Sequence, residues 1–260
     1  MVVVTSSQRD VILDAVRAMY TDVARHPEQG FHFPTGRPAC EALGYPADQL
    51  DRLPPTVVAS FAGVGYPFAA QVIRPGDTVL DIGSGSGTDA FIAAHLVGPA
   101  GRVIGLDMTA PMREKLMTHA RELGLDHVET LDGNAEEIPL PDACVDVVTS
   151  NGVLNLVPDK TAAFRELGRV LTRGGRLQLS DIVVGTLPSD ACRNESRLWA
   201  ECIVGATTND DYLRLIEAAG LTRIEVLCEE DYFAHSASAE TRKVAAGFGA
   251  HALTLRAIKE

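Results

Sequence analysis

The sequence lacks several features that mark other classes of protein. No apolar run approaches the roughly 20 residues that a bilayer-spanning helix needs, and the apolar start of the chain is too short for a signal peptide. No Lys- or Arg-rich run occurs, and the formal net charge of −12 opposes contact with nucleic-acid phosphates. These absences argue against a membrane span and a nucleic-acid substrate, and they predict a cytoplasmic protein.

Cysteine is scarce, and its spacing shows no pairing pattern. The chain has five cysteines, at positions 40, 144, 192, 202 and 228, and no two of them form a Cys-x-x-Cys pair. An odd number without such a pair signals neither a disulfide framework nor a zinc site. We therefore expect no metal site. The 46% hydrophobic content of the 260 residues suffices for one large α/β core.

A closely spaced glycine trio after an apolar run is the most informative feature that the chain does have. Residues 79–82 read Val-Leu-Asp-Ile, and Gly83, Gly85 and Gly87 follow. This pattern predicts a buried strand followed by a loop whose main chain a ligand can approach closely, because glycine has no side chain. It also predicts a helix whose N-terminus points at the same ligand. Dinucleotide loops place a third glycine where this chain has Thr88. The spacing instead resembles the S-adenosylmethionine (SAM) loop of class I methyltransferases.

Strand and helix patterns alternate along the chain after this point. We expect strands at 78–82, 102–106, 127–131, 144–149, 176–181, 222–228 and 250–257. We expect helices at 88–97, 111–123, 159–171, 190–204 and 209–219. Such alternation is typical of a parallel sheet with helices on both faces. The weakly alternating last strand suits an antiparallel position, so we predict a Rossmann-like α/β fold with a seven-stranded, mostly parallel sheet.

The first part of the chain is expected to form a helical cap or lid. Residues 9–24 repeat apolar side chains at the spacing of one helix face. The aromatic, turn-rich stretch 30–38 predicts an ordered loop that lies over another part of the protein and forms no regular element. We therefore divide the chain into an N-terminal helical cap at 1–55 and a SAM-binding methyltransferase domain at 56–260.

The residues that follow each predicted strand are the candidates for ligand contact, because ligands of open parallel sheets bind beyond the carboxyl ends of the strands. A carboxylate such as Asp107 suits a ribose diol, and a thioether such as Met108 suits the face of an adenine ring. An acidic residue about 20 residues after a glycine loop also fits NAD, so Asp107 alone leaves both cofactors open. The predicted cofactor contacts are Asp81, Gly83, Ser84, Gly85, Gly87, Asp107, Met108, Asn134, Ala135 and Asn151.

Three further stretches, at 105–112, 150–160 and 169–177, carry a narrower signal. They read GLDMTAPM, SNGVLNLVPDK and RVLTRGGRL, and the chain resembles the arsenite methyltransferase family from roughly residue 56 to 220. The resemblance implies a class I SAM-dependent methyltransferase. It also implies SAM contacts at Asp81, Gly83, Gly85, Asp107, Met108, Asn134, Ala135 and Asn151.

The resemblance breaks at the cysteines that hold trivalent arsenic in that family. The family has cysteine where this chain has Val64 and Gly152, and only Cys202 falls on a matching ligand position. Arsenic(III) is held by soft thiolates, and one thiolate cannot form a three-coordinate cage. If arsenic(III) were bound, a second thiolate ligand would have to come from Cys40 of the predicted cap. We therefore predict a small organic acceptor, with Cys202 as the catalytic-site thiol if an arsenical is accepted.

Without those cysteines, we expect a site that suits a carbon skeleton. Its rim is predicted to consist of Val64, Tyr66, Gly152 and the aromatic loop 31–33. Proximity, alignment and exclusion of water can supply much of the catalysis of an in-line methyl transfer, so a general base is optional. If the acceptor is a hydroxyl or an amine, His32, His235 or Asp181 is the candidate base.

Three other interpretations stay open. One is methylation of a trivalent arsenical or another soft metalloid or thiol acceptor at the same site. Another is an NAD-dependent oxidoreductase, and the last is a protein that binds SAM without turnover. The sequence gives neither the atom that is methylated nor the oligomeric state.

Overall fold

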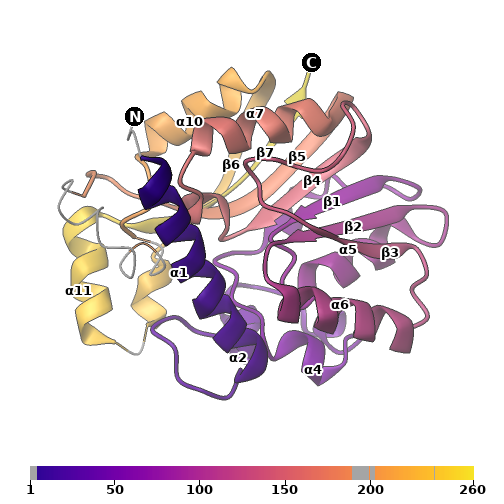
Figure 1. The fold of residues 1–260 in the computed structure, drawn as a ribbon, viewed down its shortest axis with the longest axis horizontal. Helices are drawn as coiled ribbons and strands as arrows, with labels where there is room; N and C mark the ends of the chain where they lie inside the picture. The colour runs from indigo at the N-terminus through magenta and orange to yellow at the C-terminus, as the bar shows by residue number, and fades with distance from the viewer. Residues whose placement is uncertain (1–4, 189–198, 200–202, 237) are drawn as a thin grey trace.

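A seven-stranded sheet forms the centre of the computed structural model, which describes residues 5–188, 199, 203–236 and 238–260 (Figure 1). The strands lie in the order β3-β2-β1-β4-β5-β7-β6. Their bounds are β1 Thr78–Ile82, β2 Arg102–Asp107, β3 Val128–Asp132, β4 Val145–Asn151, β5 Leu171–Val183, β6 Leu221–Glu230 and β7 His251–Lys259. All neighbours pair in parallel except β7, which runs antiparallel to β5 and β6. The predicted mostly parallel sheet with an antiparallel last strand is confirmed.

Helices cover both faces of the sheet. On one face lie α5 and α6, and on the other lie α7 and α10 (Figure 1). Their bounds are Thr88–Val97, Ala110–Glu122, Lys160–Val170 and Asn209–Ala218, respectively. Each face buries its own apolar cluster, with Phe91 and Leu116 in one and Phe164 and Tyr212 in the other. Among the described residues, no helix has the length and apolar character needed to cross a membrane.

The N-terminal region adds several helices to the face that carries α5 and α6. They are α1 Ser6–Arg25, α2 Gly36–Ala42, α3 Ala47–Leu50 and α4 Pro55–Val58, followed by the 3-10 turn η1 Pro67–Ala70. A capping box at Thr5 and Gln8 starts α1. Apolar side chains of α1, among them Val16 and Val23, are buried in the same cluster as Phe91 and Leu116. The helix predicted at 9–24 is therefore present, and it is part of the core.

The glycine loop is tied to this N-terminal region by hydrogen bonds as well. The hydroxyl groups of Ser86 and Thr88 both donate to the carbonyl oxygen of Val57 in α4, at 2.8 and 3.3 Å. The loop is thus held by α4, at the end of the N-terminal region.

Three segments differ from the expectation. Residues of α2 were expected to be turn-rich, since Gly36 and Pro38 read as turn residues, yet they form a helix. The helix α11 (Ala239–Phe248) was not predicted, because only Val244 and Phe248 in its sequence AETRKVAAGF are large apolar residues, too few to show a helical period. Strand β5 begins at Leu171, earlier than expected, and a bulge follows in its pairing with β4. The helix predicted at 190–204 falls almost wholly on residues that the structure does not describe.

Candidate cofactor site

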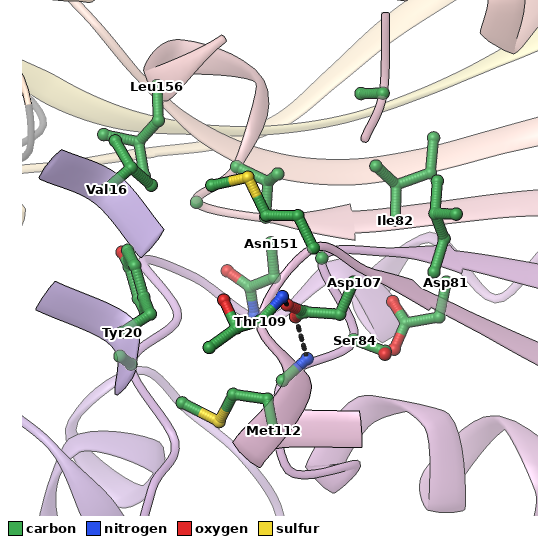
Figure 2. A pocket seen from close by; sticks show the side chains of 18 of the residues that line it. Val16, Tyr20, Asp81, Ile82, Ser84, Asp107, Thr109, Met112, Asn151 and Leu156 are labelled. Carbon is green, nitrogen blue, oxygen red and sulfur yellow. Dashed lines mark hydrogen bonds between the residues drawn. The ribbon is translucent and has the colours of Figure 1, made fainter. Parts of the chain in front are cut away.

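A cavity lies at the carboxyl ends of the parallel strands, where the glycine loop meets the loops that follow β2, β3 and β4 (Figure 2). This is the position at which open parallel sheets bind ligands. Nine of the ten predicted cofactor contacts line it, namely Asp81, Gly83, Ser84, Gly85, Asp107, Met108, Asn134, Ala135 and Asn151. The topology therefore brings the four predicted loops together.

The glycines of the loop are needed for two different reasons. Gly83, Gly85 and Gly87 have φ of +71°, +52° and +104°, a region that favours glycine. A Cβ at Gly85 would meet only the sulfur of Met112, at 4.0 Å, so the backbone there faces open space. Gly87 does not line the cavity, and a Cβ there would lie 2.8 Å from the ring of Phe91. This glycine allows α5 to pack, although it was predicted as a cofactor contact.

Asp107 is fixed at the cavity by backbone donors. The Gly85 N–H donates to Oδ2 at 2.9 Å and the Thr109 N–H donates to Oδ1 at 2.7 Å (Figure 2). Burial raises the pKa of the Asp107 carboxyl, and these hydrogen bonds and the charge of Arg113 oppose that shift. Each carboxylate oxygen keeps a further lone pair, so Asp107 can still accept hydrogen bonds from vicinal hydroxyls.

Two buried polar atoms of the cavity wall have no hydrogen-bond partner within the described part of the chain. They are Asp81 Oδ2 and Ser84 Oγ. Buried polar atoms are almost always hydrogen-bonded, so these two are placed to receive groups of a ligand. SAM offers an ammonium, a carboxylate and a ribose diol. The unpartnered atoms, the open backbone at Gly85 and the carboxylate of Asp107 together fit this cofactor.

Helix α1 forms a wall of the cavity that the sequence did not reveal. Its residues Leu13, Val16 and Tyr20 line the cavity, and Figure 2 shows Val16 and Tyr20 on the ribbon of α1 beside it. The helical period indicated an apolar face that includes Val16 and Tyr20. It gave no signal for what that face covers.

A salt bridge ties α1 to the rim of the cavity. Arg9 Nε donates to Glu136 Oε2 at 2.5 Å, and the other oxygen of Glu136 accepts from the backbone N–H of Asp159 at 2.7 Å. Glu136 lines the cavity and its side chain is 5% exposed. The start of α1 is therefore attached to the loops after β3 and β4.

Asn151 lines the cavity, but its amide is used within the protein. Its Oδ1 accepts from the N–H groups of Val64 and Gly65 at 2.8 and 3.3 Å. Its Nδ2 lies 3.0 Å from Asp89 Oδ2, from the hydroxyl of Tyr45 and from the carbonyl oxygen of Gly65. The Tyr45 hydroxyl donates to Asp89 Oδ1 at 2.6 Å. Asn151 thus joins Tyr45 of the N-terminal region, the start of α5 and the loop 63–65.

The predicted rim of the acceptor site reaches the cavity only in part. Gly152 lines the cavity, whereas Val64, Tyr66 and the loop 31–33 do not. Val64 is buried, and a Cβ on Gly152 would lie 3.0 Å from its Cγ1. Phe33 stacks on Tyr20 of α1, with ring centroids 6.2 Å apart. The aromatic loop therefore supports α1 instead of lining the site.

None of the candidate thiols and bases whose side chains the structure describes lines the cavity. Cys202 and the side chain of His235 lie outside the described residues. Cys40 is buried in α2, where burial and the charge of Asp89 raise the pKa of its thiol. Asp181 accepts from the Tyr212 hydroxyl at 2.6 Å and from the Asn155 N–H at 2.9 Å. Cys40, His32 and Asp181 do not line the cavity.

Known proteins share this sequence pattern and fold. A family model described as a methyltransferase domain matches residues 73–220. The arsenite methyltransferase of Halobacterium salinarum is 38% identical over 192 residues, covering 74% of this chain and 49% of the relative. The arsenite methyltransferase of Aquipseudomonas alcaligenes is 37% identical, covering 70% of this chain and 55% of the relative. The chain spans about half the length of these curated relatives.

A solved structure extends the comparison to the fold. CrArsM, an arsenic(III) S-adenosylmethionine methyltransferase from Chlamydomonas reinhardtii, aligns with a TM-score of 0.66 at 33% identity, covering 85% of this chain and 73% of that chain. Of the two cofactor classes that Asp107 alone left open, the comparisons support SAM. The chain therefore belongs to the methyltransferase-domain family and has its Rossmann-like class I fold, as a member of the arsenite methyltransferase family that lacks cysteine at positions 64 and 152.

Proposed function

We propose that the protein transfers a methyl group from SAM to a small organic acceptor. Bound SAM supplies a methyl group on a sulfonium centre, which a nucleophile can displace in line. Asp107 would hold the ribose hydroxyls. Asp81, Ser84 and the backbone at Gly85 would hold the amino-acid end. The remaining contribution of the protein is to align the acceptor and to exclude water.

The proposal of an organic acceptor rests on the residues at positions 64 and 152, Val64 and Gly152, which lie in contact. The family that the chain resembles has arsenic-binding cysteines at both positions, and here an isopropyl group and a hydrogen atom occupy them. Apolar side chains line the cavity beside Gly152, among them Val153, Leu156 and Val157. Such a wall suits a carbon skeleton, whereas trivalent arsenic needs several thiolates. None of the free cysteines of the described chain lines the cavity, namely Cys40, Cys144 and Cys228.

We further propose that residues 1–55 act as a cap over the cavity. Three side chains of α1 line the cavity, and the pair Arg9 and Glu136 holds that helix to the rim. A closed cap would keep water away from the reacting centre, and its movement would let ligands enter and leave.

The same site argues against nucleic acid as a partner. Its four lining carboxylates would repel phosphate groups, and no Lys or Arg of the described chain lines it. We propose a small-molecule acceptor and a reducing compartment such as the cytoplasm, since the described cysteines are free.

An acceptor screen tests the proposal. The protein is incubated with methyl-labelled SAM and with phenols, amines, thiols or arsenite as separate acceptors, and the labelled product and S-adenosylhomocysteine are measured. We expect label on an organic acceptor, and far less label with the variant Asp107→Ala. SAM binding without turnover on any acceptor would overturn the proposal of an enzyme in favour of a binding protein.

Methylation of a trivalent arsenical is the second candidate function, favoured by the arsenite methyltransferases among the relatives. In this case Cys202→Ser should abolish transfer to arsenite and leave SAM affinity unchanged. Equal arsenite methylation by this variant and the wild type would exclude a thiolate role for Cys202.

A further inference from the structure

A short turn after β4 forms part of the cavity wall. The 3-10 turn η2 (Leu154–Leu156) places Leu156 at the cavity, and the next residue, Val157, lines the cavity as well. Figure 2 shows the side chain of Leu156 at this wall. We call residues 155–157 the η2 wall. A turn this short leaves backbone groups at its ends without partners inside it, so its position depends on what binds those groups from outside.

Lys160, at the start of α7, binds the backbone of the η2 wall. Its Nζ donates to the carbonyl oxygens of Asn155 and Val157, both at 2.9 Å. The side chain is half-buried, and it does not line the cavity. Hydrogen bonds from a charged donor are about twice as strong as neutral ones. One ammonium group thus joins the two ends of the wall.

Trp199 and Asp181 bind the backbone groups of the wall that lie between and beside those of Lys160. The indole Nε1 of Trp199 donates to the carbonyl oxygen of Leu156 at 2.8 Å, and Asp181 Oδ2 accepts from the Asn155 N–H at 2.9 Å. Trp199 and Asp181 are 2% and 1% exposed, and neither lines the cavity. Lys160 Nζ lies 5.6 Å from the ring centroid of Trp199, and its positive charge also stabilises the carboxylate of Asp181. The three side chains therefore support one another as well as the wall.

The packing around the η2 wall leaves little room for it to shift. A Cβ at Gly205 would lie 2.6 Å from the carbonyl oxygen of Asn155 and 2.6 Å from Trp199 Nε1. At the other end of the turn, a Cβ at Gly83 of the glycine loop would lie 2.3 Å from Val153. Since protein interiors transmit strain instead of absorbing it, loss of one anchor should displace the side chains that line the cavity.

We propose that Lys160 is a positioning residue for the methyl acceptor, which acts by holding Leu156 and Val157 of the η2 wall, together with Trp199 and Asp181, against the acceptor's apolar part. The inference rests on the proposed function, because it requires an organic acceptor beside the cofactor. In-line methyl transfer depends on the alignment of the acceptor atom with the sulfonium methyl group, so a displaced wall would impair acceptor binding.

The fluorescence of Trp199 provides a direct readout. It is the only tryptophan of the chain, and its ring N–H is bound to the η2 wall. The wild-type protein is first saturated with S-adenosylhomocysteine, so that no turnover occurs. It is then titrated with phenol as a probe for the acceptor. We expect a saturable change in the emission of Trp199.

Two lysine variants separate positioning from a merely structural role. In Lys160→Met, phenol should bind about fivefold more weakly, because Leu156 and Val157 must then be ordered when the probe binds. The affinity for S-adenosylhomocysteine, measured by calorimetry, should not change. Lys259→Met is the matched control. Lys259 Nζ also donates to a backbone carbonyl oxygen, that of Leu171 at 2.7 Å, at the start of β5 and away from the cavity. This variant should change neither affinity.

Trp199→Phe provides the test if Lys160→Met does not fold. It keeps an aromatic ring and removes the N–H that binds Leu156, so phenol binding followed by calorimetry should weaken in the same direction. This variant should also leave the affinity for S-adenosylhomocysteine unchanged.

The outcomes separate the inference from the proposed function. Wild-type phenol affinity in both Lys160→Met and Trp199→Phe, or an equal loss in Lys160→Met and Lys259→Met, would overturn the inference and leave methyl transfer intact. Absence of saturable phenol binding to the wild type would also overturn it. Absence of heat with S-adenosylhomocysteine would overturn the proposed function, and the inference with it.

Discussion

The salt bridge between Arg9 and Glu136 sets how firmly α1 is held over the cavity. The Arg9 side chain is 37% exposed and that of Glu136 is 5% exposed, with 2.5 Å between Nε and Oε2. Hydrogen bonds to charged groups contribute about 1.5–3 kcal/mol, whereas exposed ion pairs contribute about 0–1 kcal/mol. One partner is buried and the other is partly exposed, so we expect a contribution of about 1–2 kcal/mol. Arg9→Met removes the guanidinium group and keeps an apolar stem.

If α1 must move for a ligand to leave, the lost interaction will appear in the dissociation rate. A change of 1–2 kcal/mol corresponds to roughly 5–30-fold faster release. The protein is loaded with labelled S-adenosylhomocysteine, an excess of unlabelled ligand is added, and the loss of bound label is followed in time. We expect Arg9→Met to release the label faster within this range.

Arg17→Met is the matched control on the same helix. Arg17 pairs with Asp14 at 2.7 Å, and the two side chains are 47% and 72% exposed. Such an exposed ion pair contributes little to the free energy that holds the helix in place. The release rate of labelled S-adenosylhomocysteine should therefore change by less than about twofold. Equal release rates in Arg9→Met and Arg17→Met would refute the idea that this salt bridge holds a lid.

Three further predictions concern the cofactor site and the stability of the fold. Asp107→Ala should weaken SAM binding by about 1–3 kcal/mol in calorimetry, because a buried acceptor for ribose hydroxyls is lost, and unchanged affinity would remove this assignment. Gly83→Ala should lower the melting temperature more than Gly76→Ala. Both glycines have positive φ, so the backbone strain is shared. A Cβ at Gly83 would lie 2.3 Å from the side chain of Val153, whereas a Cβ at Gly76 would meet nothing within 4 Å. Equal shifts in melting temperature would contradict the close contact at Gly83. Burial raises the pKa of Asp181 from 3.8 to about 6, so the folded state holds this proton more tightly than the unfolded state. The free energy of unfolding should therefore fall by up to about 3 kcal/mol from this group as pH rises from about 4 to 6, and Asp181→Asn should flatten that slope in thermal melts. A wild-type slope in the variant would assign the pH dependence to other groups.

The parallel half of the sheet and most of the cofactor site could be predicted because their signals are local. An apolar run that ends in the glycine loop specifies β1 and the start of α5 within a few residues. The ends of parallel strands converge at one edge of the sheet, so polar residues such as Asp107 and Asn134 could be assigned to one site from their positions alone.

The remaining features depend on contacts between residues far apart in the sequence. The amide of Asn151 bonds Tyr45 and Asp89, which are 106 and 62 residues away along the chain. Arg9 and Glu136 are separated by 127 residues. No periodicity or spacing carries information over such separations. For this reason the role of Asn151 and the wall formed by α1 became visible only in three dimensions.

The burial of Val16 and Val23 together with Phe91 and Leu116 bears on how the protein can be divided. A fragment that starts at residue 56 would leave the apolar sides of α5 and α6 facing solvent, and it should aggregate instead of behaving as an autonomous module. Exchange of the first 55 residues between relatives would have to preserve this packing. The proposed cap and the rest of the chain should therefore unfold together as a single cooperative unit.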